Sequence, residues 1–130
     1  MTPAVARWLE RVLHALPVAP RPDGYNPLAE KHLEPSRVQR LGQAGIDCFA
    51  AIAQMDLHRL GASMNACMEC WEALLPHTVR HRTVDVDLPG LLRVYQAQSA
   101  GAMFSGCGGG YLFVVSDDPV PGAFKVTVRL

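Results

Sequence analysis

A glycine-rich segment between two apolar runs constrains the fold of this 130-residue chain more than any other feature. Residues 106–110 hold four glycines in five positions, with Cys107 as the exception. Residues 101–105 lead into the segment and residues 111–115 leave it, and both runs have the apolar character of buried strands. Glycine is costly to order and is selected where the backbone takes a positive φ or approaches another group closely. The pattern therefore predicts two strands joined by a loop with a specific role.

Three interpretations of this loop compete. The simplest is a plain connection between two strands. The second, a dinucleotide-binding fingerprint, is disfavoured because Tyr111 stands where G-x-G-x-x-G needs its third glycine. A strand is also predicted to follow, where the fingerprint opens a helix. The third is a phosphate cradle of another kind, which is not a Walker A loop because no Lys-Ser or Lys-Thr pair follows the glycines.

Composition and charge exclude several classes of protein. Hydrophobic residues make up 49% and charged residues 18% of the chain, which is typical of a packed domain. Twelve basic and twelve acidic residues cancel, so no basic excess exists to recruit nucleic acid or an anionic membrane. No apolar run approaches the length of a membrane span, and Arg7, Glu10 and Arg11 make the amino terminus unlike a signal peptide. We therefore expect a cytoplasmic protein whose four cysteines are reduced.

The amino-terminal residues predict a helix followed by a linker. The helix covers residues 3–16, with Thr2 as its N-cap and Pro3 at its first position. Its apolar residues recur at helical spacing, and Pro17 ends it. Four prolines in residues 17–27 predict an extended linker with turns.

Three further helices are predicted in the middle of the chain. They cover residues 36–54, residues 57–75 with Asp56 as N-cap, and residues 88–98 with Asp87 as N-cap. Only a short turn separates the first two of these helices, so we expect them to form an antiparallel hairpin.

The strands are concentrated in the last third of the chain. Residues 83–86 alternate and form a possible short strand, and residues 102–105 and 111–115 flank the glycine loop. Residues 124–130 alternate between apolar and polar side chains, which predicts a half-buried strand. Helices that precede strands favour an α+β fold with an antiparallel sheet.

Two pairs of residues have the spacing of metal ligands. They are Cys67-x-x-Cys70 and His77-x-x-x-His81. Only six residues separate the pairs, whereas a zinc finger needs about a dozen to build its turn. Cys67 also lies in the apolar stripe of the helix predicted over residues 57–75, where cysteine serves as a small hydrophobe. A packing role is therefore favoured over a zinc site or a redox site.

Other polar residues have two interpretations each. His77, Arg80, His81 and Arg82 either complement the carboxyl end of a helix or contact an anionic group of a substrate. Cys107 has the chemistry of a nucleophile, but no partner base can be assigned to it from the sequence. Its position among small residues favours a packing role.

The segment Gly-Ala-Met-Phe-Ser-Gly-Cys-Gly-Gly-Gly-Tyr resembles the third conserved motif of the GHMP kinase superfamily. The positions that carry the resemblance are Ser105, Gly106, Cys107, Gly108, Gly109 and Gly110. The resemblance extends over roughly residues 24–130 and implies the carboxy-terminal domain of such a kinase, preceded by a helix and Pro-rich linker in residues 1–23. It implies a ferredoxin-like antiparallel sheet with additional helices packed on one face.

The resemblance also implies a function and its cofactors. GHMP kinases transfer the γ-phosphoryl group of ATP, with Mg²⁺, to a small molecule, and the heptose-kinase branch suggests a sugar or sugar phosphate here. In the family the glycine motif lies beside the cleft that binds nucleotide and substrate, so the six motif residues are the candidate cofactor-binding residues.

What this chain lacks is equally informative. The family's main ATP loop, Pro-x-x-x-Gly-Leu-Gly-Ser-Ser-Ala-Ala, is absent, together with the amino-terminal domain that supplies it and any catalytic carboxylate. We therefore expect no catalytic residue here and no activity from the chain alone. The alternative is a non-catalytic binding or assembly module of the same fold. A homo-oligomer is also expected, with Trp8, Leu9 and Leu13 as candidates for an exposed apolar patch.

Overall fold

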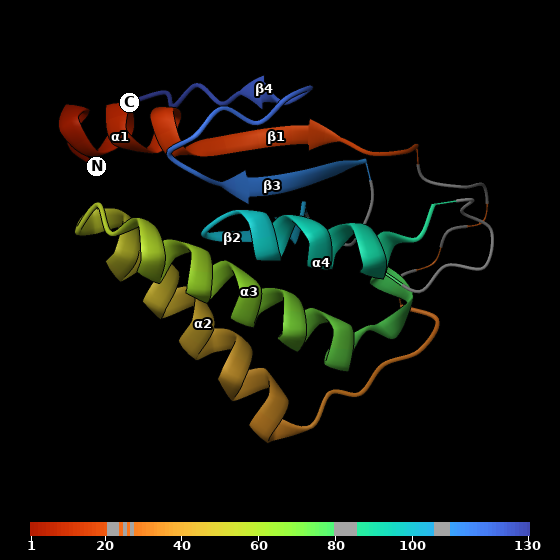
Figure 1. Ribbon diagram of the computed structural model, residues 1–130. Coiled ribbons are helices and arrows are strands. Elements are labelled where there is room, and N and C mark those ends of the chain that lie inside the picture. The colour runs from red at the N-terminus through yellow and green to blue at the C-terminus, as the bar shows by residue number, and fades with distance from the viewer. Residues whose placement is uncertain (21–23, 25, 27, 80–85, 106–109) are drawn as a thin grey trace.

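The structure is a computed structural model that describes residues 1–20, 24, 26, 28–79, 86–105 and 110–130. Within these residues the chain is an α+β protein with four α-helices and a four-stranded antiparallel sheet (Figure 1). The helices are α1 (Pro3–Val12), α2 (Pro35–Ala53), α3 (Leu57–Leu74) and α4 (Leu88–Gln98), with a short 3₁₀ turn η1 (Pro76–Thr78) after α3. The strands are β1 (Leu13–Pro17), β2 (Gly101–Phe104), β3 (Tyr111–Val115) and β4 (Phe124–Lys125).

The sheet has the strand order β2-β3-β1-β4, and every neighbouring pair is antiparallel. In the register of β1 and β3, Leu16 pairs with Leu112 and His14 pairs with Val114. The amino-terminal strand β1 therefore lies inside the sheet, hydrogen-bonded on both sides to strands from the end of the chain. Residues 13–17, which the sequence assigns to a helix and a linker, form part of the central structure.

The prediction of a helix over residues 3–16 is wrong in its second half. The helix α1 ends at Val12, and Leu13 is extended, with φ −95° and ψ 124°. His14 is buried in β1, and its Nε2 lies 3.1 Å from the carbonyl oxygen of Ser116, to which it donates. The local sequence suits a helix, but pairing with β3 and β4 provides hydrogen bonds and burial that override this preference.

The other helices confirm the predictions to within one residue at each end. The amino termini of α3 and α4 are fixed by the expected caps, because Asp56 Oδ1 accepts from Arg59 N at 3.0 Å and Asp87 Oδ1 accepts from Gly90 N at 3.0 Å. Thr2 Oγ1 likewise accepts from Val5 N, at 3.2 Å. As expected, α2 and α3 form an antiparallel hairpin (Figure 1).

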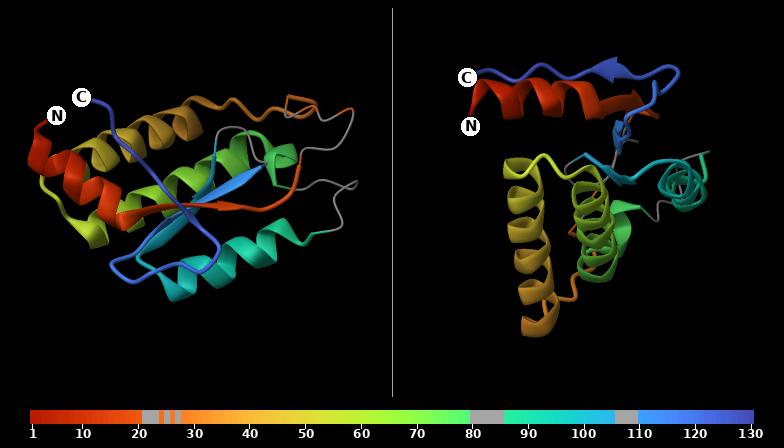
Figure 2. Two further views of the ribbon diagram at one scale, coloured as in Figure 1. Left: turned by 90° about the horizontal axis from the view of Figure 1, so that it is seen from above. Right: turned by 60° about the vertical axis from the view of Figure 1, so that its left-hand side comes forward.

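The strands flanking the glycine loop are confirmed, but the prediction of a strand over residues 124–130 is largely wrong. The strand β4 covers only Phe124 and Lys125. Beyond it the chain leaves the sheet and contacts α1, because Val128 N donates to Glu10 Oε1 at 2.8 Å. The two termini consequently lie near each other, beside α1 (Figures 1 and 2). Most of the possible strand over residues 83–86 lies outside the described residues, and Val86 is in a bend.

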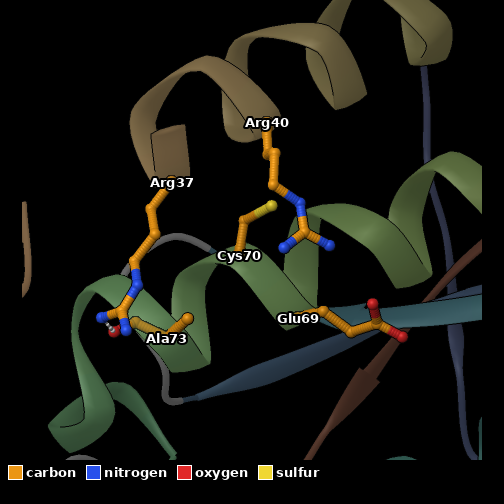
Figure 3. Close-up of a pocket in the computed structure, with 5 residues that line it drawn as sticks. All are labelled: Arg37, Arg40, Glu69, Cys70 and Ala73. Atoms are coloured by element: carbon orange, nitrogen blue, oxygen red, sulfur yellow. Dashed lines mark hydrogen bonds between the residues drawn. The ribbon is translucent and has the colours of Figure 1, made fainter. Parts of the chain in front are cut away.

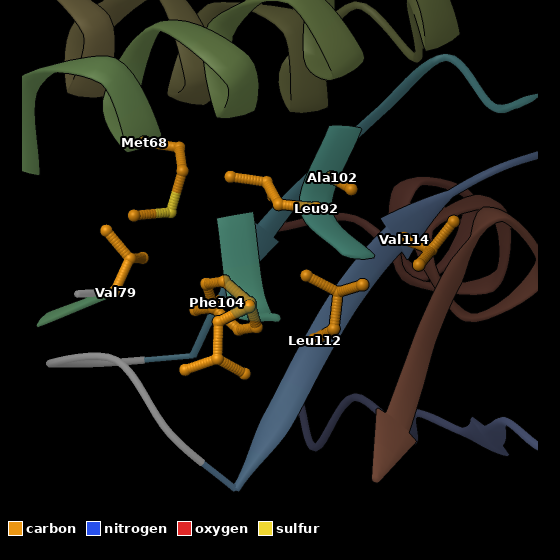
Figure 4. Packing of buried hydrophobic residues seen from close by; sticks show 8 residues of the cluster. Met68, Val79, Leu92, Ala102, Phe104, Leu112 and Val114 are labelled. Carbon is orange, nitrogen blue, oxygen red and sulfur yellow. The ribbon is translucent and has the colours of Figure 1, made fainter. Parts of the chain in front are cut away.

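Two apolar clusters hold the layers together. The first lies between the sheet, α3 and α4, and its most buried members include Phe104, Leu112 and Val114 (Figure 4). The second lies where α1, α2 and α3 meet, and it includes Leu9 and Val115. Burial of this apolar surface is the main favourable contribution to folding.

The candidates for an exposed apolar patch on the first helix are placed wrongly by the sequence. Leu9 is only 9% exposed, and Trp8 and Leu13 pack against the second cluster. Exposed apolar residues occur at several other places, among them the helix α2, where Phe49 is 75% and Ile46 is 63% exposed.

Candidate functional site

The glycine segment joins the edge strand β2 to its neighbour β3. Ser105 N donates to the carbonyl oxygen of Tyr111 at 3.0 Å and closes the hairpin immediately before the loop. Of the six candidate residues, the structure describes Ser105 and Gly110. The remaining four lie outside the described residues; they are Gly106, Cys107, Gly108 and Gly109.

Gly110 fixes the far end of the loop and needs to be glycine for conformational reasons. Its φ is +85°, a value that side chains with a Cβ rarely adopt. Its carbonyl accepts from Val18 N at 2.8 Å, and its N–H donates to Ala19 O at 3.1 Å. A Cβ at this position would meet no atom within 4 Å, so space is not the constraint. The end of the loop is thus bonded to the continuation of β1.

The base of the hairpin rests on a rigid apolar floor. Phe104 is 1% exposed and Leu112 is fully buried, and both pack in the cluster that contains Val79 of the segment after η1 and Leu88 of α4 (Figure 4). Well-packed side chains of this kind hold the strand ends in one arrangement. The strand ends on either side of the glycine segment are therefore anchored in the first apolar cluster.

The strand β2 is held against α3 by a contact between two backbones. A Cβ on Gly61 of α3 would overlap the carbonyl oxygen of Ala100, and a Cβ on Gly101 would overlap the carbonyl oxygen of Gly61. One turn further along α3, Asn65 Oδ1 accepts from Ala102 N at 2.9 Å and satisfies a donor at the edge of the sheet. Sequence reasoning missed Gly61, Gly101 and Asn65, although a glycine inside a helical pattern is itself a sign of close approach.

Of the basic cluster that the sequence indicates, the structure describes one member, while Arg80, His81 and Arg82 lie outside the described residues. His77 Nε2 lies 3.4 Å from Glu30 Oε2, and His32 Nε2 lies 2.8 Å from Glu30 Oε1. The hydrogen bond with His32 is the main cause that holds the pKa of Glu30 below its ordinary value. His77 thus faces a carboxylate at the surface.

The two cysteines with metal-ligand spacing, Cys67 and Cys70, lie on α3 and face α2. Cys48, Cys67 and Cys70 are free thiols that are partly buried. Burial raises the pKa of Cys67, and the neighbouring Cys48 and Cys70 raise it further. This shift disfavours the thiolate, which is the form that binds metals and attacks electrophiles. Within the described part of the chain, no three His, Cys, Asp or Glu side chains are grouped as metal ligands.

A small open cavity of about 230 Å³ lies between α2 and α3 (Figure 3). Its lining includes two arginines, a glutamate and a cysteine; the residues are Arg37, Arg40, Glu69, Cys70 and Ala73. Arg37 is held in place, because its Nη1 donates to Ala73 O at 3.2 Å and its Nε lies 3.6 Å from a Glu34 oxygen. Charges of both signs line the cavity, so it does not define one class of ligand.

None of the described helices is both long enough and apolar enough to cross a membrane. Comparison of the chain with protein-family models, with curated proteins and with solved structures found no match. The glycine motif and the described residues around it are therefore the features of this chain that point to a function.

Proposed function

We propose that this chain is the carboxy-terminal domain of a GHMP-type kinase and that residues 105–110 contribute to its nucleotide and substrate cleft. The reaction is transfer of a phosphoryl group from ATP, with Mg²⁺, to a small alcohol, for which a sugar or sugar phosphate is the preferred class. The observation that carries the proposal is the β2–β3 hairpin, because it holds the motif between two strands and fixes Gly110 by hydrogen bonds to Val18 and Ala19. Such a kinase uses cellular ATP, so the proposal places the protein in the cytoplasm.

The geometry suits this role for a physical reason. Phosphoryl transfer depends mainly on positioning and on stabilisation of charge. A loop whose two ends are fixed can offer backbone N–H groups to phosphate oxygens with little reorganisation. Hydrogen bonds hold Ser105 and Gly110 in this way, and the neighbouring Phe104 and Leu112 are buried.

The order of the strands supports the proposal that the sheet is ferredoxin-like. Both β1 and β2 are antiparallel to β3, which lies between them in the sheet. Along the chain, helices α2, α3 and α4 connect β1 to β2. This is a split β-α-β arrangement, the unit from which a ferredoxin-like sheet is built. One departure is that a connection without an α-helix joins β3 to β4.

The first test compares two versions of the protein. One is the present chain, and the other adds the protein segment encoded upstream of it. Calorimetric titration with ATP and Mg²⁺ should give tight binding with the longer version and at most weak binding with the present chain. An activity assay with a sugar or sugar phosphate should give phosphorylation only with the longer version. Stoichiometric phosphorylation by the 130-residue chain would contradict the expectation that the chain alone is inactive. Absence of ATP binding by both versions would remove the proposal.

A second test uses the loop itself within the longer, active version. Gly108→Val should reduce phosphoryl transfer by about a hundredfold or more, because small misplacements at a reacting centre have effects of that size. Its free energy of unfolding should stay within about 1–2 kcal/mol of the parent. The matched control is Ala97→Val at an exposed position of α4, which should leave phosphoryl transfer unchanged and lower the free energy of unfolding by less than about 1 kcal/mol. Unchanged turnover in folded Gly108→Val would take the loop out of the active site.

The second candidate function is a non-catalytic binding or assembly module. The observation that favours it is the exposed apolar surface of α2, where Ile46 and Phe49 are largely accessible. An assembly module would bind no ATP in either version of the protein, so the calorimetric titration separates the two candidates.

A further inference from the structure

Three large apolar side chains of the helix α2 are exposed to solvent, namely Val38, Ile46 and Phe49, whereas Ile52 packs half-buried against the second cluster. The buried residues of α2 are the small Ala44 and Ala51. The opposite side forms a continuous stripe at spacings of three and four residues, which we call the outer face of α2; it consists of Val38, Gly42, Gly45, Ile46, Phe49 and Ala53. An amphipathic helix normally turns such a stripe towards a partner, so this face has the pattern of a contact surface.

No packing contact among the residues that the structure describes requires the two glycines on the outer face. A Cβ built on Gly42 or on Gly45 would meet no atom within 4 Å. Glycine inside a helix is unfavourable relative to alanine, because it loses more conformational freedom on folding. The glycines therefore leave an open notch in the surface of α2, into which a side chain from outside can fit.

The outer face also provides a side chain that matches this notch. Phe49 is 75% exposed and lies one turn beyond Gly45. A two-fold axis passing between Gly45 and Ile46 places Phe49 of one copy opposite Gly42 of the other, and places Val38 opposite Ala53. We propose that two copies of this chain associate through antiparallel contact of their α2 helices, with each Phe49 seated in the notch of its partner.

The charges are compatible with this arrangement. None of the six residues of the outer face is ionisable, so no like charges meet at its centre. The formal net charge of the chain is zero, so two copies do not repel each other as wholes. Antiparallel docking also places the amino end of each helix beside the carboxyl end of the other, which is the favourable arrangement of their dipoles.

The surface area is sufficient for a reversible dimer. A helix of the length of α2 spans about 28 Å, and contact along it buries on the order of 1,000 Å² over both copies, the lower limit for a specific interface. An apolar groove of about 280 Å³ extends the surface at the end of α2; it is lined by Met1, Thr2, Val5, Phe49, Ile52 and Ala53. The two-fold arrangement brings the partner's Val38 beside this groove. We therefore expect weak association that depends on concentration.

Sedimentation of the 130-residue chain tests the arrangement without ATP, so its outcome is independent of the proposed kinase function. The parent should change reversibly from monomer to dimer between about 5 and 500 μM. Phe49→Gly and Gly42→Phe should each weaken association at least about tenfold, because each removes one half of the match. The dimer dissociation constant of the double variant Gly42→Phe/Phe49→Gly should return to within about threefold of the parent value, because the phenylalanine and the glycine opposite it have exchanged positions.

Val94→Gly is the matched control, since Val94 is 49% exposed on α4 and away from the outer face. It should leave association unchanged, and circular dichroism should show that each variant is folded. Phe49→Ala replaces Phe49→Gly if the latter unfolds. A parent that stays monomeric, single variants that associate normally, a double variant that does not recover, or a control that loses association would each overturn the proposal.

Discussion

The helices α2 and α3 both contain glycine in their interiors, but the two settings are opposite. In α3, Gly61 touches the backbone before β2 so closely that no Cβ can be accommodated. In α2, Gly42 and Gly45 face open space. The same residue type is thus required by packing in one helix and is unexplained by packing within the chain in the other.

This difference distinguishes the packed contact of α3 with β2 from the exposed face of α2, which is accessible to a partner. The contact between Gly61 and Gly101 fixes β2, and β2 in turn carries the glycine loop. On the outer face of α2, an added Cβ at Gly42 or Gly45 would meet none of the described atoms within 4 Å. Substitutions at these glycines should therefore change stability in opposite directions.

The largest effect is expected for Gly61→Ala. The added methyl group overlaps the carbonyl of Ala100, and neither backbone can move without separating α3 from β2. Overpacking of this kind should lower the free energy of unfolding by about 3 kcal/mol or more, as measured by urea denaturation. Gly45→Ala is the matched control, and a loss of stability confined to Gly61→Ala is expected. A Gly61→Ala variant as stable as the parent would contradict the close contact.

A smaller loss is expected for Asn65→Ala. This change removes the acceptor for Ala102 N, which lies in a fully buried residue at the edge of the sheet. An unsatisfied buried donor should lower stability by about 1–3 kcal/mol in the same urea experiment. Alanine at the exposed Gln98 serves as the control. Equal stability of the two variants would show that Asn65 does not anchor β2.

The substitutions Gly42→Ala and Gly45→Ala should each stabilise the monomer. Alanine is favoured over glycine inside a helix by about 0.5–1 kcal/mol, and no contact in the chain opposes the added methyl group. Thermal unfolding at a low protein concentration, where association does not contribute, measures this gain. Destabilisation by either change would show that the outer face of α2 is not open as described.

The smallest effect is expected at the surface cluster of Glu30, His32 and His77. The pKa of Glu30 is lowered from 4.5 in the folded state, so the folded chain binds fewer protons there than the unfolded chain in the acid range. The stability that Glu30 contributes is therefore present above its ordinary pKa and is lost as the pH falls through the lowered value. The parent should be slightly more stable than Glu30→Gln near neutral pH, and the two should converge in acid. A difference that grows in acid would contradict this sign.

Much of the fold could be predicted because its signals are local. A cap residue and the apolar spacing after it depend only on nearby atoms, so Asp56 and Asp87 located the starts of two helices correctly. The two strands around the glycine loop were predicted for the same reason. For the candidate site, the sequence found the motif and both of its flanking strands.

Other features could not be predicted because they depend on distant parts of the chain. The sequence does not show that the small Ala44 and Ala51 of α2 are buried while Phe49 faces solvent. The pairing of Gly61 with Gly101 joins residues whose closeness only the packing of α3 on β2 reveals. The hydrogen bonds from Val18 N to Gly110 O and from Gly110 N to Ala19 O likewise connect distant parts of the sequence.

The sequence by itself determined where helices begin, where the glycine loop lies and that the protein is of the α+β class. Only the tertiary structure decided the secondary structure of residues 13–17 and 126–130. Residues 13–17 suit a helix but become a central strand, because β3 and β4 supply hydrogen-bonding partners on both sides. Residues 126–130 suit a strand but leave the sheet, with Val128 N bonded to Glu10. A strand exists only where another strand pairs with it, and that pairing is a property of the whole fold.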